Sequence, residues 1–190
     1  MDNDALNAGV MLGGITSRTE IRILICYILK TIDKPIPSIV LKEVLHYEGI
    51  ANYFEVSYAI SELETNGHIQ VVAEDGDKHF IVSATGVDIA KTLESNLPIT
   101  IRKLSCDSIT KRLSRIRHEK ENRVTIKILE KGCIVTCSVL EGTNEVLTVS
   151  LFVPDEDCAK KIKESFLDDP TSVFIGVTNI MLKDPNENSV

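Results

Sequence analysis

The chain has 190 residues, which is long for one small domain and short for two large ones. Its net charge of −7 and its pI near 5.2 argue against tight non-specific DNA binding, because typical nucleic-acid-binding proteins are basic. The odd number of cysteines, five, and the lack of a secretory signal are typical of a reducing cytoplasm. No apolar run reaches the ~18 residues of a membrane span. We therefore expect a cytoplasmic protein that does not bind membranes.

Charge is unevenly distributed along the sequence. Met1–Glu94 carries seven Lys or Arg residues against 14 Asp or Glu residues. Ser95–Thr125 reverses this balance, with eight basic residues against three acidic ones. The interpretation we favour is a solvated helix face whose charges pair with the acidic remainder. The alternative is a set of phosphate anchors lying beside DNA.

The first predicted helix follows Ser17-Arg18-Thr19-Glu20, which fits a capping box with Ser17 at the N-cap. Its apolar residues cover nearly all sides, so the helix is buried on more than one side. Contact with the rest of the chain and contact with a second subunit explain this equally well. Residues 1–16 before it are expected to form a loose tail or an arm that docks on a partner.

Two further helices follow after short turns. Ser38 is placed to cap the second helix, and Gly49 to end it. Asn52 then opens the third, with Glu55 at the N3 position, and Asn66-Gly67 ends it. Three helices in this order predict a helix-turn-helix.

A hairpin is predicted next, with strands at Ile69–Ala73 and His79–Val82 around an Asp75-Gly76 turn. Ser83 is expected to cap a fourth helix. The order of three helices and a hairpin is that of a winged helix-turn-helix domain, which we assign to residues 17–94.

The rest of the chain predicts a linker and a second domain. Residues 98–121 fit one or two helices that join the domains or mediate dimerisation. Residues 122–183 then alternate like three antiparallel strands, followed by a helix that starts with Pro154 at N1. Val173–Leu182 fits a strand or a helix equally well by periodicity. The fold class is therefore α+β, with a helical linker and a C-terminal three-stranded antiparallel sheet packed with one or two helices.

Several stretches of the chain recur in a characteristic order: Ile23–Leu29, Asn52-Tyr53-Phe54, Ile60–Leu63, Phe80–Gly86 and Leu151–Pro154 with the helix around Ala159. Together these stretches resemble a bacterial winged-helix family, the domain of unknown function numbered four-three-six-four. Members are described as candidate transcriptional regulators, and the resemblance implies a helical last segment. The order of these stretches along the chain, rather than any single motif, carries the resemblance.

The resemblance implies that the third helix enters the DNA major groove. From Tyr53 to Gln70 the chain has no Arg or Lys, the residues that most often read guanine. The DNA-binding candidates are therefore polar residues of the third helix and the hairpin. They are Asn52, Ser57, Tyr58, Ser61, Lys78 and His79.

No arrangement of catalytic residues, phosphate-binding loop or metal-ligand spacing is present, so we expect no enzyme, no cofactor and no metal. The function we predict is a DNA-binding transcriptional regulator of the winged-helix type. It would act as a homodimer on double-stranded DNA, and a small-molecule effector is compatible with it. The alternative is a winged helix that binds other proteins without binding DNA. The acidic N-terminal half and the third helix without Arg or Lys motivate that alternative.

Overall fold

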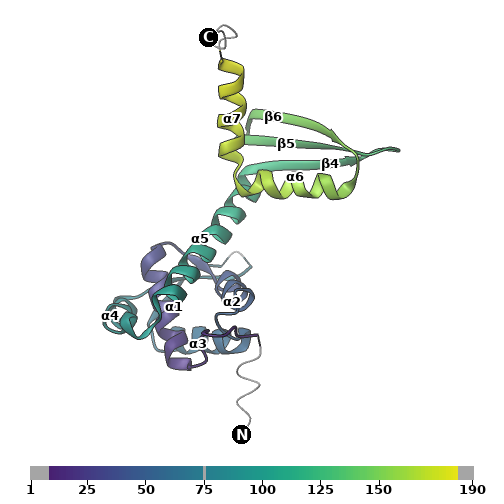
Figure 1. Ribbon diagram of the computed structural model, residues 1–190. Coiled ribbons are helices and arrows are strands. Elements are labelled where there is room, and N and C mark those ends of the chain that lie inside the picture. Colours follow the sequence, from purple (N-terminus) through teal and green to yellow (C-terminus); the bar gives the residue numbers. More distant parts are fainter. Residues whose placement is uncertain (1–8, 75, 184–190) are drawn as a thin grey trace, which may run out of the picture. The chain divides into compact units, whose positions relative to one another are not determined.

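The computed structural model describes residues 9–74 and 76–183, and these residues form an α+β fold (Figure 1). Within them are seven α-helices and two three-stranded antiparallel sheets. The chain divides into two compact units, Met1–Leu113 (unit 1) and Ser114–Val190 (unit 2). None of the described helices combines the length and the apolar character that crossing a bilayer requires.

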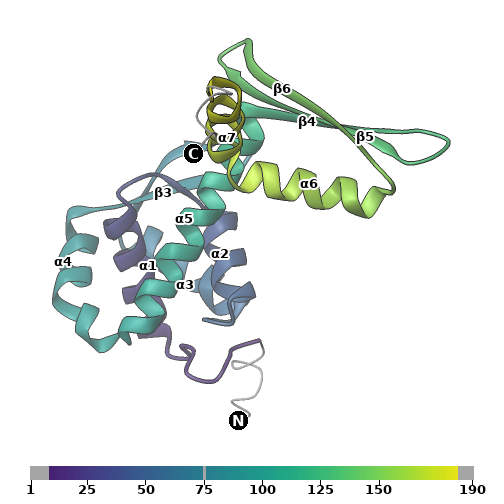
Figure 2. The same ribbon diagram turned by 45° about the horizontal axis from the view of Figure 1, so that its top comes forward.

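Unit 1 contains a helical bundle with a small sheet (Figure 2). Its elements, in chain order, are α1 (Arg18–Ile32), β1 (Ile36–Pro37), α2 (Ser38–Tyr47), α3 (Tyr53–Thr65), β2 (Ile69–Glu74), β3 (Lys78–Val82), α4 (Ala84–Leu93) and a 3₁₀ turn (Glu94–Asn96). Helix α1 is the centre of this unit, since it packs against α3, α4 and β3. Seven of its residues are buried, as its apolar sequence predicts. Contacts within the unit therefore account for its burial.

The helix starts follow the sequence expectations in part. Asn52 caps α3, since its Oδ1 accepts from the amides of Phe54 (2.9 Å) and Glu55 (3.4 Å). Ser17 stands at the N-cap of α1 but forms no capping hydrogen bond. Ser38 was expected to cap α2 and instead is its first residue. The amide of Ile39 donates to the Asp77 carboxylate (2.8 Å), so the β2–β3 loop supplies the acceptor that a local cap would provide.

The small sheet has the order β1-β3-β2, with both pairs antiparallel. The expected hairpin is present as β2 and β3, and β1 adds a short third strand that the sequence did not reveal. Gly76 has a φ of 78°, which is the left-handed backbone conformation expected in the turn. Asp75, the other turn residue, lies outside the described residues.

Residues 9–16 pack on unit 1 itself. The amide of Met11 donates to the Gly49 carbonyl and that of Ile15 to the Ile50 carbonyl, both at 2.7 Å, and Ile15 is buried. This part of the expected arm is therefore bound to its own chain. The expectation for residues 1–8 lies outside the described residues.

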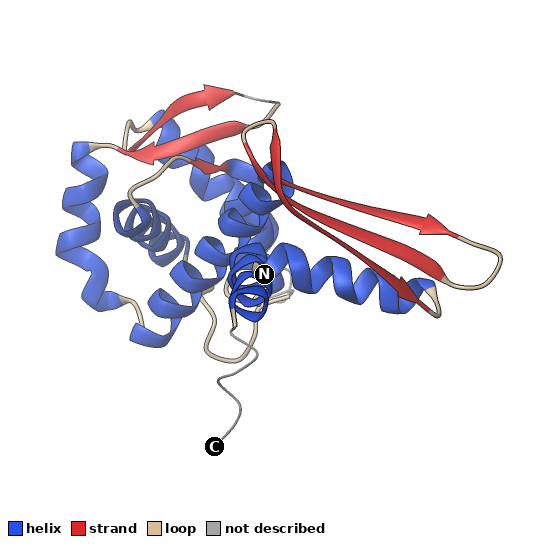
Figure 3. Ribbon diagram, turned by 90° about the horizontal axis from the view of Figure 1, so that it is seen from above, coloured by secondary structure: helices blue, strands red, loops and turns tan. Residues whose placement is uncertain are grey.

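Helix α5 (Ile99–Glu121) is one continuous helix, and the boundary between the two units falls within it. The remaining elements belong to unit 2. They are β4 (Asn122–Ile128), β5 (Cys133–Glu141), β6 (Asn144–Val153), α6 (Glu156–Asp168) and α7 (Pro170–Leu182). Figure 3 shows strands in red and helices in blue.

The sheet of unit 2 is an antiparallel meander with the order β4-β5-β6. Helix α6 packs on one face, against all three strands. The core between them contains Cys133, Val135, Val153, Ala159 and Phe166. The opposite face carries hydroxyl side chains, because residues alternate between the two faces of a sheet. Thr136 and Ser150 on this face are hydrogen bonded at 2.9 Å.

The two helices of unit 2 begin at aspartate caps. Pro154 was expected at the first position of α6, but Asp155 is the N-cap and accepts from the amide of Cys158 (2.7 Å). Asp169 caps α7 in the same way through Ser172, with Pro170 as the first helical residue. The ambiguous last segment is thus a helix, as the family resemblance implied.

Candidate functional site

Helix α3 is the candidate site, because one of its faces is built into unit 1 and the other is open. Its inner residues Val56, Ala59, Ile60 and Leu63 are buried against α1, α2 and β2. The exposed positions follow at helical spacing and carry no charge. They are Phe54, Tyr58, Ser61 and Thr65.

The predicted binding residues of α3 differ in their availability. Asn52 is buried, and its side-chain oxygen serves as the cap of the helix. The Ser57 hydroxyl donates to the Tyr53 carbonyl (2.9 Å) and is half-buried. Tyr58 and Ser61 are exposed on the outer face. Of these four residues, Tyr58 and Ser61 therefore present the most accessible side chains.

The two predicted residues of the hairpin lie on β3. Lys78 Nζ forms an ion pair with Glu64 of α3 at 2.6 Å, which ties the hairpin to the helix. The Nδ1 atom of His79 lies 3.2 Å from the Asp77 carbonyl. Lys78 and Tyr58 therefore come from two elements that are directly linked, whereas His79 is engaged with its own loop.

Every carboxylate on α3 is paired with a cation from another element. Arg18 of α1 forms a two-pronged ion pair with Glu55, with Nε–Oε2 at 2.6 Å and Nη2–Oε1 at 3.1 Å. These hydrogen bonds to Glu55 raise the pKa of Arg18, so its positive charge is held in place. Arg22 pairs with Glu62 at 3.3 Å, and Lys78 with Glu64. The surroundings of α3 are therefore charge-balanced rather than positive.

Aromatic side chains around the start of α3 were not among the predicted site residues. Phe54 and Tyr47 are largely exposed, and Tyr53 lies between Phe54 and His46 in edge-to-face contacts. The Arg18 guanidinium lies 4.8 Å from the centre of the Tyr58 ring. Helical periodicity could have identified Phe54, because it falls opposite the buried stripe of α3.

A family model described as a domain of unknown function (DUF4364) matches residues 21–181. The chain belongs to this family. The match extends from α1 to α7 and so includes both units of the DUF4364 chain. Neither a curated protein nor a solved structure matches the chain.

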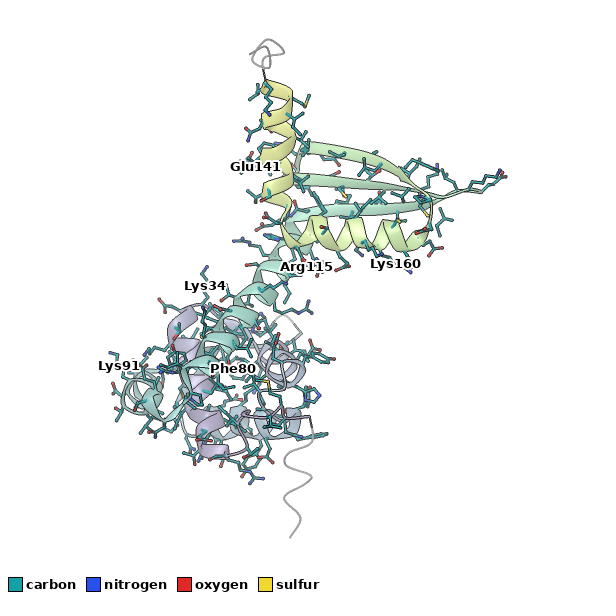
Figure 4. The ribbon with its side chains drawn as sticks, viewed as in Figure 1. Lys34, Phe80, Lys91, Arg115, Glu141 and Lys160 are labelled. Atoms are coloured by element: carbon teal, nitrogen blue, oxygen red, sulfur yellow. The ribbon has the colours of Figure 1, made fainter. Side chains whose placement is uncertain are left out.

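Some of the cations in the basic segment Ser95–Thr125 of this DUF4364 member form contacts within their own unit. In unit 1, Arg102 stacks on Tyr27 and lies 3.9 Å from Glu94. In unit 2, Arg115, which is labelled in Figure 4, forms ion pairs with Glu119 (2.9 Å), Glu164 (2.6 Å) and Asp168 (2.9 Å). The exposed remainder is a smaller group of cations. It consists of Lys103, Lys111, Arg112, Arg117, Lys120 and Arg123.

The described residues contain no group of three or more His, Cys, Asp or Glu side chains that could hold a metal. All five cysteines are free thiols. Burial raises the pKa of the Cys26 thiol to about 11, so this side chain is neutral and acts as a small apolar core residue.

Proposed function

We propose that unit 1 of this DUF4364 protein is a winged helix-turn-helix domain that binds double-stranded DNA as part of a dimeric transcriptional regulator. The observation that carries the proposal is the open, uncharged face of α3 next to the β2–β3 hairpin. Helices α1 and α2 support the inner face of α3, and Lys78 fixes the hairpin to it. In this proposal α3 enters the major groove and the hairpin is the wing.

The side chains on the exposed face of α3 favour weak discrimination between DNA sequences. The hydroxyls of Tyr58 and Ser61 can donate to or accept from base edges and phosphates, and the Phe54 ring can contact thymine methyl groups. The nearby cations Arg18, Arg22 and Lys78 are held by α3 carboxylates, so DNA phosphates must compete with Glu55, Glu62 and Glu64 for them. Few phosphate contacts per subunit give weak binding, which is why the proposal includes a dimer.

A second candidate function is a winged helix that recognises another protein. The specific observation that favours it is the combination of a charge-balanced helix with exposed Tyr47, Phe54 and Tyr58. Exposed aromatic residues are enriched in protein interfaces, whereas DNA-binding surfaces are strongly positive. The two candidates use the same face of α3 and differ in the partner.

Selection of bound fragments from a random double-stranded DNA pool, repeated over a salt series, separates the two candidates. A DNA reader enriches a motif, and Tyr58→Ala or Ser61→Ala changes the preferred bases within it. Lys78→Ala weakens all sites alike, because phosphate contacts carry no sequence information. Lys91→Ala on α4 is the matched control and leaves binding unchanged. No enriched motif, with binding that vanishes at modest salt, would exclude the DNA reader and favour the protein-binding candidate.

A further inference from the structure

The two outer strands of the unit 2 sheet differ in how well their edges are protected. Within the described residues, neither β4 nor β6 has a strand partner on its outer side. Strand β4 carries Arg123 and Lys127 as exposed charges, which is a common protection against pairing with another chain. Strand β6 has no charge and no proline from Val146 to Val153. Its one carboxylate, Glu145, is neutralised by Arg123 at 3.0 Å.

Strand β6 is also long and open. It has ten residues, and seven of them are exposed. A long, uncharged edge strand presents a row of backbone N–H and C=O groups that another strand can pair with. The β6 edge is therefore the place in unit 2 where the sheet can continue.

An apolar surface adjoins this edge. A pocket of about 200 Å³ is lined mainly by apolar side chains from β5, β6, α6 and α7, among them Leu151, Phe166 and Val173. Helix α7 has no charged residue over its 13 positions. Its outer positions Ile175, Ile180, Met181 and Leu182 are exposed. Neighbouring exposed apolar side chains of this kind are typical of an interaction site.

We propose that β6 pairs antiparallel with β6 of a second copy of this chain and joins the two sheets into one of six strands. Two identical strands paired antiparallel are related by a two-fold axis, so each copy donates and accepts the same hydrogen bonds. In a register that preserves the alternation, Leu147, Val149 and Leu151 meet apolar residues on the α6 face.

The polar positions Glu145, Thr148 and Ser150 of β6 are also compatible with self-pairing. Thr148 and Ser150 lie on the hydroxyl face of the sheet, so polar residues of the two copies meet there. Glu145 stands near one end of the strand and therefore does not oppose its own copy. The two-fold axis also brings the apolar surface around the pocket next to the same surface of the second copy. This interface deepens the proposed function by specifying its dimer, and it is tested without DNA.

The test is sedimentation equilibrium of the full chain as wild type and as two matched variants. Leu151 on β6 is 45% exposed and Ile128 on β4 is 64% exposed, and both point to the α6 face at opposite edges of the sheet. Leu151→Lys places an unpaired charge in the interface and raises the dimer dissociation constant by about 100-fold or more. Ile128→Lys leaves it unchanged. A monomeric wild type, or equal effects of the two substitutions, would overturn the proposal.

Cross-linking provides a second measurement that does not depend on how Leu151→Lys folds. Thr148 on β6 and Thr125 on β4 are both exposed and lie on the hydroxyl face of the sheet. With a short thiol-reactive cross-linker, Thr148→Cys gives covalent dimer above the wild-type background, and Thr125→Cys does not. No excess dimer from Thr148→Cys, or an equal amount from Thr125→Cys, contradicts pairing through β6.

Discussion

The two units of this protein differ in how completely each buries its apolar residues. In unit 1 the isoleucine-rich helix α1 is covered within the unit, and the small sheet carries the buried Phe80 (Figure 4). In unit 2 one helix packs on one sheet face, while α7 and the β6 edge leave large apolar side chains exposed.

In our proposal, this difference corresponds to a division of labour between the two units. A unit whose central helix is buried by its own elements needs no partner to cover that helix, and it can present selected side chains, as α3 does. A unit with an uncharged strand edge and an apolar helix gains most from association, because burial of apolar surface is the main favourable term in assembly. Unit 1 is therefore the recognition unit in our proposal, and unit 2 is the assembly unit.

The largest expected effect compares two phenylalanines. Phe80 is 1% exposed and pairs with both β1 and β2, whereas Phe152 of unit 2 is 66% exposed. Phe80→Ala should lower the free energy of unfolding by about 3–5 kcal/mol, because it leaves a cavity. Phe152→Ala should change it by less than about 0.5 kcal/mol in the dilute chain. Urea denaturation followed by circular dichroism measures the free energy of unfolding of both variants. Comparable losses in the two variants would contradict the difference between the buried and the exposed phenylalanine.

The second prediction concerns Arg115, which is nearly buried in unit 2 and binds three carboxylates. Arg115→Met should cost about 1–3 kcal/mol of stability, because these charged hydrogen bonds are lost together. Arg117, two residues further along α5 and exposed on another side of the helix, is the control. Arg117→Met should cost less than about 0.5 kcal/mol, since its pair with Glu121 is solvated. Equal shifts in melting temperature for the two variants would contradict a larger contribution of the Arg115 ion pairs to stability.

The third prediction concerns the cap of the proposed recognition helix. Asn52→Ala should destabilise unit 1 by about 1 kcal/mol, because two amides at the start of α3 lose their acceptor. Asn66→Ala at the exposed other end should change stability by less than about 0.5 kcal/mol. Hydrogen exchange of the first turn of α3 reports the effect directly. Unchanged protection in Asn52→Ala would rule out this capping role.

The smallest expected effect is the acid sensitivity of the caps in unit 2. Hydrogen bonds from the Cys158 amide and from Ser172 lower the pKa of Asp155 and of Asp169, respectively. A folded-state pKa below the unfolded value means that each contribution is present above the unfolded pKa and is lost as pH falls through the folded pKa.

Asparagine at these positions keeps an acceptor but does not titrate. The double variant Asp155→Asn/Asp169→Asn should therefore lose less stability between about pH 5 and about pH 2 than the wild type does. Thermal unfolding across this pH range measures the difference. Parallel curves for the two proteins would contradict a contribution from these caps.

Local signals predicted most of the secondary structure. The Asn52 cap, the Gly49 and Gly67 helix ends and the alternation of β4, β5 and β6 each depend on residues close together in sequence. The α7 helix required the family resemblance, because β-branched residues make its periodicity ambiguous.

Contacts between distant segments could not be read from local patterns. Asp77 supplies the acceptor at the start of α2 from 38 residues away, which displaced Ser38 from its expected role. Likewise Arg18 reaches Glu55 across 37 residues, so the charge balance around α3 became visible only in the fold. The polarity of the α3 face was predictable, whereas the pairing of the cations beside it was not.

The division of labour is tested most directly by selecting DNA fragments with wild type and with Leu151→Lys side by side. We predict that wild type enriches two copies of one half-site related by two-fold symmetry at a fixed spacing. The variant should enrich the same half-site as a single copy, since unit 1 is intact and assembly is lost. The same two-fold motif from both proteins, or no motif from either, would contradict this division.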